Sequence, residues 1–276
     1  VADTWHSDKG PPPHALGSAD WFRVIVRAVP LAILVFSGLA ILLLVRLIER
    51  PFFGLRRPVT PYLTQFVCRS AFVLMGIRYR SDGQPMRGPG AVVANHSSWL
   101  DIFALNARKR IYFVSKSEVA GWPVIGWLAR ATGTVFMKRV RSEVSNQIAL
   151  FRSRLNAGHK LLFFPEGTST DGQQVLAFKP ALFATFFDPG LRDTLRIQAV
   201  TVNYSPPEGA DPRFYGWWGD MDFGPHLLAT LAARKQGFVQ VVYHPPVRVA
   251  DYDNRKILAK EMEDTVRASL AVHGTD

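Results

Sequence analysis

The sequence predicts an α/β fold, a mainly parallel or mixed sheet flanked by helices, with an N-terminal membrane-associated helical hairpin. Downstream of residue 78, short β-rich runs alternate with helix-like stretches, which is typical of strands joined by crossover helices. Residues 28–45 form an uncharged apolar run close to the shortest length that spans a bilayer. We therefore divide the chain into a flexible tail (1–22), a membrane-docking hairpin (23–77) and an α/β domain (78–276).

Composition narrows the class of protein. The 276 residues include 33 Lys and Arg against 22 Asp and Glu, a net charge of +11, while 48% are hydrophobic. This hydrophobicity excludes global disorder. A chain that is both basic and apolar favours an anionic membrane surface, and we expect no nucleic-acid partner. The single cysteine, Cys68, excludes an internal disulfide and a cysteine zinc cluster, and no metal site is expected.

The predicted hairpin has two helices. Arginines flank its first apolar run on both sides and are denser after it, at Arg23, Arg27, Arg46, Arg50, Arg56 and Arg57. Residues 62–77 place apolar side chains at helical spacing with polar ones on another face, as interfacial helices do. The hairpin either crosses the membrane once or dips into one leaflet; two core helices are the alternative. The charge bias predicts that the remaining chain faces the cytoplasm.

The α/β region contains six predicted strands, at residues 91–94, 111–114, 134–137, 161–164, 197–202 and 239–243. Helix-like stretches lie at residues 99–107, 124–131, 142–157, 181–187 and 255–270. Charge is uneven, because residues 101–160 hold 11 basic and 3 acidic residues, a balance of 11 − 3 = +8. Such a balance favours an anionic ligand or surface, although the basic run at residues 108–110 is interpreted as solvated, with no chemistry implied.

His96 follows the strand at residues 91–94, and Asp101 comes five residues later, where a helix is expected to begin. An aspartate that accepts a bond from one imidazole nitrogen leaves the other nitrogen free to take a proton. The pair is therefore a candidate general base with its orienting carboxylate. The alternative is a histidine that caps a helix or bonds within the core.

Two further blocks close predicted strands. Residues 164–168, Phe-Pro-Glu-Gly-Thr, form a turn with a glycine and hydroxyls, and such turns point backbone N–H groups toward anions; an ordinary strand-exit turn is the alternative. Residues 133–139 end a third strand with the cations Lys138 and Arg139. If the three strands are parallel neighbours, their ends meet at one sheet edge, where α/β sheets bind ligands.

Taken together, these blocks resemble the glycerolipid acyltransferase family, which includes bacterial 1-acyl-glycerol-3-phosphate acyltransferases. Asn95, His96 and Asp101 match its NHxxxxD motif, residues 133–139 its second motif, and residues 164–168 its FPEGT motif. The resemblance spans residues 70–250 in order. Two departures stand out: residues 199–202 read Ala-Val-Thr-Val where the family has Val-Pro, and Lys179 is followed by Pro180 and Ala181 rather than by a glycine.

The resemblance implies a membrane-bound O-acyltransferase that moves an acyl group from a thioester to the free hydroxyl of a lysophospholipid. The first candidate reaction converts 1-acyl-glycerol-3-phosphate to phosphatidic acid, with His96 as general base and Asp101 orienting it. The substrate-binding residues that it implies are Lys138, Arg139, Glu166, Gly167, Thr168 and Lys179. No cofactor is expected; acyl-CoA or acyl carrier protein serves as co-substrate and partner.

Two alternatives stay open at this point. Similar enzymes acylate a lyso-aminolipid such as lyso-ornithine lipid, and Asp220 and Asp222 in the segment 217–222 could bind an amino headgroup. A non-catalytic lipid-binding membrane protein on the same fold is the alternative from another class. In either enzymatic case the expected partners are a lysolipid, an acyl donor and the bilayer. The expected location is the bacterial inner membrane, with the catalytic domain on its cytoplasmic face.

Overall fold

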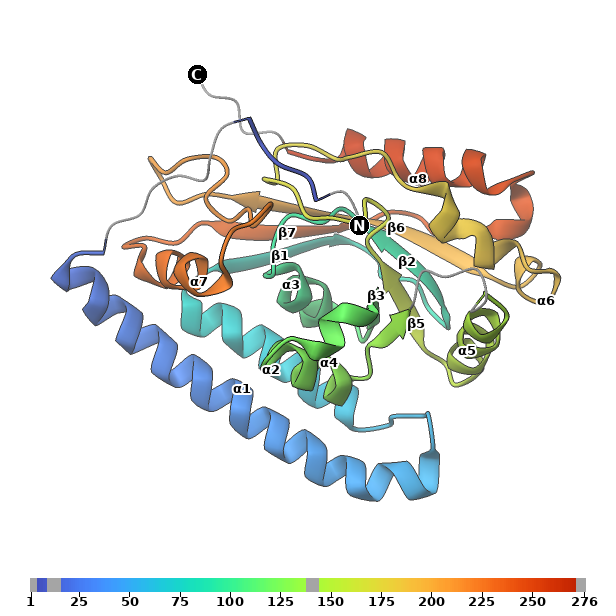
Figure 1. Cartoon of the computed structure of the whole chain (residues 1–276), viewed down its shortest axis with the longest axis horizontal. Coiled ribbons are helices and arrows are strands. Elements are labelled where there is room, and N and C mark those ends of the chain that lie inside the picture. Colours follow the sequence, from blue (N-terminus) through green and yellow to red (C-terminus); the bar gives the residue numbers. More distant parts are fainter. Residues whose placement is uncertain (1–3, 9–15, 138–143, 272–276) are drawn as a thin grey trace.

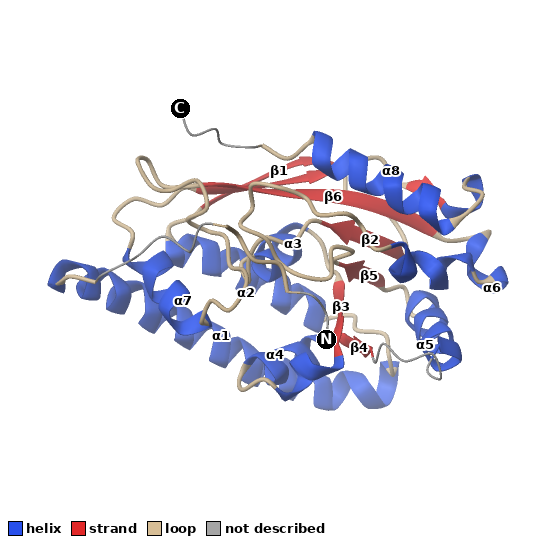
Figure 2. Cartoon of the chain, turned by 45° about the horizontal axis from the view of Figure 1, so that its top comes forward, coloured by secondary structure: helices blue, strands red, loops and turns tan. Residues whose placement is uncertain are grey.

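The computed structural model describes residues 4–8, 16–137 and 144–271. A mixed sheet lies between two layers of helices (Figures 1 and 2), which confirms the predicted α/β fold. The strand order is β1-β7-β6-β2-β5-β3-β4, and β8 pairs with β6. Among the described residues the strands are β1 (Arg78–Gly83), β2 (Gly90–Ala94), β3 (Tyr112–Lys116), β4 (Val135–Met137), β5 (Lys160–Phe163), β6 (Arg196–Ser205), β7 (Phe238–Tyr243) and β8 (Val247–Arg248).

Strand β2 lies at the centre of the sheet and is buried along its whole length, as expected for a parallel strand covered on both faces. It pairs in parallel with β5 on one side and with β6 on the other. Strand β3 is parallel to both β5 and β4, whereas β7 and β8 are antiparallel to β6. The carboxyl ends of β2, β5, β3 and β4 therefore meet at one edge, as the sequence predicts for its three motifs.

Helices cover both faces of the sheet (Figure 2). One layer consists of α1 (Ser18–Phe53), α2 (Thr60–Met75), α3 (Asp101–Arg108), α4 (Ile125–Thr132) and α7 (Phe223–Ala232). The other consists of α5 (Val144–Asn156), α6 (Pro189–Arg192), α8 (Arg255–Ala268) and the 3₁₀ helix Pro180–Phe187. Because side chains alternate along a strand, Val92 and Ala94 join the core under the first layer and Ala91 and Val93 that under the second.

Helices α1 and α2 run side by side in opposite directions (Figure 1). Helix α1 begins at Ser18, inside the segment 1–22 predicted to be a tail, because the carboxylate of Asp20 accepts the Gly17 N–H at 2.8 Å and closes the first turn. It is long and apolar enough to cross a membrane. The buried Glu49 accepts the backbone N–H groups of Val59 and Thr60 at 2.6 and 2.9 Å, which fixes the start of α2.

Candidate active site

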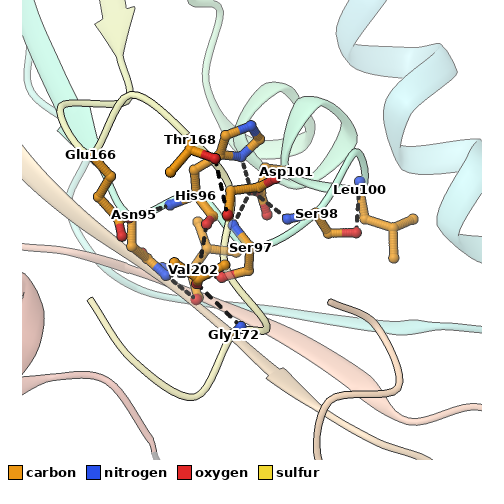
Figure 3. A network of polar contacts seen from close by, with 12 residues as sticks. Asn95, His96, Ser97, Ser98, Leu100, Asp101, Glu166, Thr168, Gly172 and Val202 are labelled. Carbon is orange, nitrogen blue, oxygen red and sulfur yellow. Dashed lines mark hydrogen bonds and ion pairs between the residues drawn. The ribbon is translucent and has the colours of Figure 1, made fainter. Parts of the chain in front are cut away.

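The first motif brings a histidine and an aspartate into contact (Figure 3). His96 follows β2, Asp101 opens α3, and His96 Nδ1 lies 2.7 Å from Asp101 Oδ2. The same oxygen accepts the backbone N–H groups of Ser97 and Ser98 at 2.9 and 3.1 Å. The hydroxyl of Tyr204 donates to Asp101 Oδ1 at 2.7 Å. The fully buried carboxylate is therefore satisfied on both oxygens and cannot turn away from the imidazole.

The hydrogen-bond pattern assigns the imidazole tautomer. An ionised carboxylate only accepts hydrogen bonds, so His96 Nδ1 carries the proton and Nε2 is left as an acceptor. The side chain of His96 is 22% exposed, which leaves it open to a substrate. The ring of Phe164 stacks on it with centroids 4.1 Å apart and planes 14° from parallel. Together these contacts fix the imidazole in the orientation that a general base needs.

Tyr204 is the one residue of this group that the sequence analysis missed. It lies near the end of β6, beyond the strand predicted at residues 197–202. Burial and the neighbouring Asp101 raise the pKa of Tyr204 well above its usual value, so its hydroxyl stays protonated as a donor. No local pattern links Tyr204 to Asp101, since the contact depends on β6 lying next to β2 in the sheet.

Asn95, the first residue of the NHxxxxD motif, holds two strands together. Its side-chain oxygen accepts the Val202 N–H at 2.8 Å, and its side-chain nitrogen donates to the Val202 carbonyl at 2.9 Å. The end of β2 is thereby tied to β6. Because His96 is the next residue, this pair of bonds positions the chain from which the imidazole projects.

Glu166 of the FPEGT motif lies inside the protein, contrary to its predicted contact with substrate. It is 1% exposed, and its two oxygens accept the backbone N–H groups of His96 and Leu176, each at 2.7 Å. Burial raises the pKa of Glu166 to about 8. The side chain thus joins the third motif to the first and positions His96, and its oxygens are already occupied by backbone donors.

The turn that follows Glu166 brings three other predicted residues together. Gly167 has φ of +80°, and a Cβ built there would lie 3.0 Å from Lys179 Nζ, so a side chain would displace the lysine. Thr168 Oγ1 accepts the Trp5 N–H at 3.3 Å. The ammonium group of Lys179 therefore lies beside the predicted anion-binding turn.

The second motif is described only in part. Strand β4 ends at Met137, and its parallel pairing with β3 places that end at the same sheet edge as His96. Lys138 and Arg139, the cations predicted to bind substrate, lie outside the described residues.

Comparisons with known proteins identify the class. Residues 77–204, which include the first and third motifs, match the Acyltransferase family. The chain is 53% identical to the lyso-ornithine lipid O-acyltransferase of Rhodobacter capsulatus over 266 residues, 96% of each chain. It is 32% identical to the lyso-ornithine lipid O-acyltransferase of Pseudomonas aeruginosa, over 92% of this chain and 95% of that one.

Two further comparisons concern 1-acylglycerol-phosphate acyltransferases. The chain is 32% identical to the 1-acyl-sn-glycerol-3-phosphate acyltransferase of Neisseria gonorrhoeae, over 65% of this chain and 69% of that one. The crystal structure of PlsC, the 1-acyl-sn-glycerophosphate acyltransferase of Thermotoga maritima, shares the fold, with a TM-score of 0.65, 20% identity and coverage of 91% and 93%.

Fold, motifs and relatives agree on one class, the O-acyltransferases that act on lysolipids. Within that class, the chain belongs to the glycerolipid acyltransferase family, as its motifs predict.

Proposed function

We propose that this protein transfers an acyl group from a thioester to the free hydroxyl of lyso-ornithine lipid. The observation that carries the proposal is the 53% identity to a lyso-ornithine lipid O-acyltransferase over 96% of both chains. The similarity to a 1-acyl-sn-glycerol-3-phosphate acyltransferase covers only 65% of this chain at 32% identity. This similarity supports 1-acyl-glycerol-3-phosphate as the second candidate acceptor.

In the proposed reaction His96 Nε2 takes the proton from the acceptor hydroxyl as its oxygen attacks the thioester carbonyl. The tetrahedral intermediate then expels the thiolate, which takes that proton back from His96, so that an ester and a free thiol result. The bond from His96 Nδ1 to Asp101 at 2.7 Å supports this proposal, because a nearby carboxylate stabilises the transient imidazolium. No protein nucleophile and no cofactor is required; acyl-CoA or acyl carrier protein brings the acyl group.

Both candidate acceptors carry an anionic group in the headgroup. It is a carboxylate in lyso-ornithine lipid and a phosphate in 1-acyl-glycerol-3-phosphate. Lys179 and the backbone of Gly167 and Thr168 are the proposed contacts for that group in the described part of the site. Lys138 and Arg139 are proposed to contribute further cations. Glu166, whose carboxyl bonds the backbone of His96, is proposed as a positioning residue.

The protein is proposed to act at the bacterial inner membrane with its catalytic domain on the cytoplasmic face. The outward face of α1 is apolar and exposed over most of its length, which supports membrane association. Arginines flank its apolar run on both sides, and basic residues next to a membrane segment are enriched on the cytoplasmic side, which supports the cytoplasmic orientation. The acyl chain of a lysolipid could then stay in the bilayer while its hydroxyl reaches His96.

An acceptor panel tests the proposal. Purified protein in detergent micelles is given acyl-CoA or acyl carrier protein thioester, with lyso-ornithine lipid or 1-acyl-glycerol-3-phosphate. We expect kcat/KM for lyso-ornithine lipid to be at least about tenfold higher, the effect of one well-placed charged hydrogen bond. The reverse ratio would favour the phosphate acceptor. Lysolipid binding without turnover of either acceptor would favour the non-catalytic alternative.

A further inference from the structure

A cavity lies away from the His96–Asp101 pair. It has a volume of about 410 Å³ and opens between the α1–α2 turn and the first residues of β3 and β5. Because β5 is parallel to β2, Lys160 at its amino end lies at the sheet edge opposite to His96. The cavity is therefore distinct from the site that binds the acceptor hydroxyl. Four cationic side chains line it: Arg56, Arg57, Arg110 and Lys160.

The four cations of this cavity are not neutralised by direct ion pairs among the described residues. In the part of the chain that the structure describes, none of its four cations forms an ion pair with a carboxylate. Burial, with Lys109 and Arg110 nearby, lowers the pKa of Lys160 to about 8. Burial also lowers the pKa of Arg57 to about 10. A bound anion would stabilise both charged forms.

Neutral partners hold the cations in place. Arg57 Nη1 donates to the Ala131 carbonyl at 2.7 Å, and the guanidinium of Arg110 lies 4.3 Å from the centre of the Tyr62 ring. Both contacts orient the arginines without cancelling their charge. The sequence predicts a solvated basic run at residues 108–110, but Arg110 lines this cavity.

The back wall of the cavity is neutral and rigid. The rings of His159 and Tyr112 stack with centroids 3.9 Å apart. His159 Nε2 donates to the Leu55 carbonyl at 3.0 Å, which ties the segment after α1 to the start of β5. Burial lowers the pKa of His159 to about 4, so this histidine adds no charge near neutral pH. The cavity is thus formed before any ligand arrives.

We propose that this cavity binds the phosphate headgroup of an anionic membrane phospholipid. The phosphate would meet the guanidinium and ammonium groups, since such groups bind phosphate oxygens through charge-assisted hydrogen bonds. Its acyl chains have an apolar surface beside them, because Phe52, Phe53 and Leu55 at the end of α1 are exposed. An apolar surface beside a phosphate-binding cavity fits a lipid better than a free phosphate ion. The lipid would hold this end of the hairpin at the bilayer surface.

Vesicle binding tests the proposal. The full chain is mixed with vesicles of phosphatidylcholine, or of equal parts phosphatidylcholine and phosphatidylglycerol, and flotation is measured. We expect Arg110→Gln/Lys160→Gln to weaken binding to the anionic vesicles roughly thirtyfold, since each basic residue near such a surface contributes about a fivefold effect and the two effects multiply. The control is Arg255→Gln/Lys256→Gln, which removes the same charge from the exposed start of α8. This control variant should weaken binding to the anionic vesicles less than about threefold. Equal losses in both double variants would overturn the proposal.

A second measurement separates lipid from phosphate and guards against misfolding. Water-soluble short-chain phosphatidylglycerol should bind the wild-type protein saturably and much more tightly than inorganic phosphate; equal affinities would overturn the lipid assignment. The charge-preserving Arg110→Lys should keep vesicle binding. Acyl transfer in neutral detergent micelles should be unchanged in Arg110→Gln/Lys160→Gln, because the cavity lies opposite to His96. A parallel loss of transfer would place these cations in the active site and overturn the proposal.

Discussion

Four hydrogen bonds converge on the carboxylate of Asp101, from His96, Ser97, Ser98 and Tyr204. Two of these bonds come from the backbone N–H groups of Ser97 and Ser98, which form the turn between the histidine and the aspartate. The pair needs this turn in order to meet. On a continuous helix, residues five apart point in directions roughly 140° apart. The turn wraps around the carboxylate instead and brings Oδ2 to the imidazole. The imidazole is thus oriented before substrate binds, as a preorganised general base would need to be.

Replacing His96 by alanine should abolish acyl transfer without unfolding the protein. The backbone of His96 is held independently of its imidazole, since its N–H bonds Glu166 and its carbonyl accepts the Thr170 N–H at 2.9 Å. We expect kcat to fall by about 10²–10⁴, the usual contribution of a general base. Tyr204→Phe, which removes one bond to Asp101, should cost about tenfold. Turnover of His96→Ala at or above that of Tyr204→Phe would show that His96 is not the base.

Glu166→Gln tests the contact by which Glu166 of the FPEGT motif holds the backbone of His96 in the NHxxxxD motif. The amide oxygen can accept one of the two backbone bonds, but the amide N–H₂ then faces the other donor, so we expect a loss of roughly 1–3 kcal/mol in the free energy of unfolding. Because burial raises the pKa of Glu166 from 4.5 to about 8, the folded protein retains a proton that the unfolded chain releases. The stability contributed by this group is complete below pH 4.5 and is lost as pH rises through about 8.

Thermal unfolding of the wild type and of Glu166→Gln across that pH interval provides the measurement. The glutamine cannot ionise, so the variant should lose less stability than the wild type as the pH rises. Two curves with the same slope would contradict the assigned burial effect.

At the scale of elements, the sequence predicts the strands and helices that have a clear hydrophobic pattern. The buried strands β2 and β5 and the helix α8 appear within a few residues of their predicted bounds. Strand β1 was missed because it is an edge strand whose sequence, Arg-Tyr-Arg-Ser-Asp-Gly, lacks an apolar pattern. Helix α7 was missed because glycine and proline open it. In the site, the motifs predict the His96–Asp101 contact, whereas Tyr204 and the inward position of Glu166 depend on strand order and on burial.

The packing of α1 on α2 depends on one small residue. A Cβ at Gly38 would lie 2.6 Å from Val67 Cγ2, so Gly38→Ile should force the helices apart. We expect a loss of about 1–3 kcal/mol in the free energy of unfolding in detergent, the usual cost of overpacking. Gly224→Ala in α7 is the matched control, since a Cβ there meets nothing within 4 Å. If both variants lowered the unfolding temperature equally, the contact with Val67 would not be the cause.

At the scale of the molecule, α1 lies along the globular domain rather than projecting from it (Figure 1). Near its start, the guanidinium groups of Arg23 and Arg27 donate to carbonyls at the end of α7, Arg23 to Ala232 at 2.7 Å and Arg27 to Leu231 at 2.7 Å. Near its end, Glu49 connects it to α2. A helix held at both ends favours the hairpin that dips into one leaflet, because a transmembrane position would draw α7 into the bilayer. Composition alone left both arrangements open.

The exposed face of α1 should therefore determine membrane binding. Leu44 and Leu47 are 63% and 72% exposed, so Leu44→Ser/Leu47→Ser removes apolar surface without touching the packing on α2. Burying a leucine side chain is worth about 1.5–3 kcal/mol, and the double variant should bind phosphatidylcholine vesicles at least about a hundredfold more weakly. Ile257→Ser on α8, whose isoleucine is also exposed, should bind as the wild type does. Vesicle flotation of the double variant at the wild-type level would show that this face does not enter the bilayer.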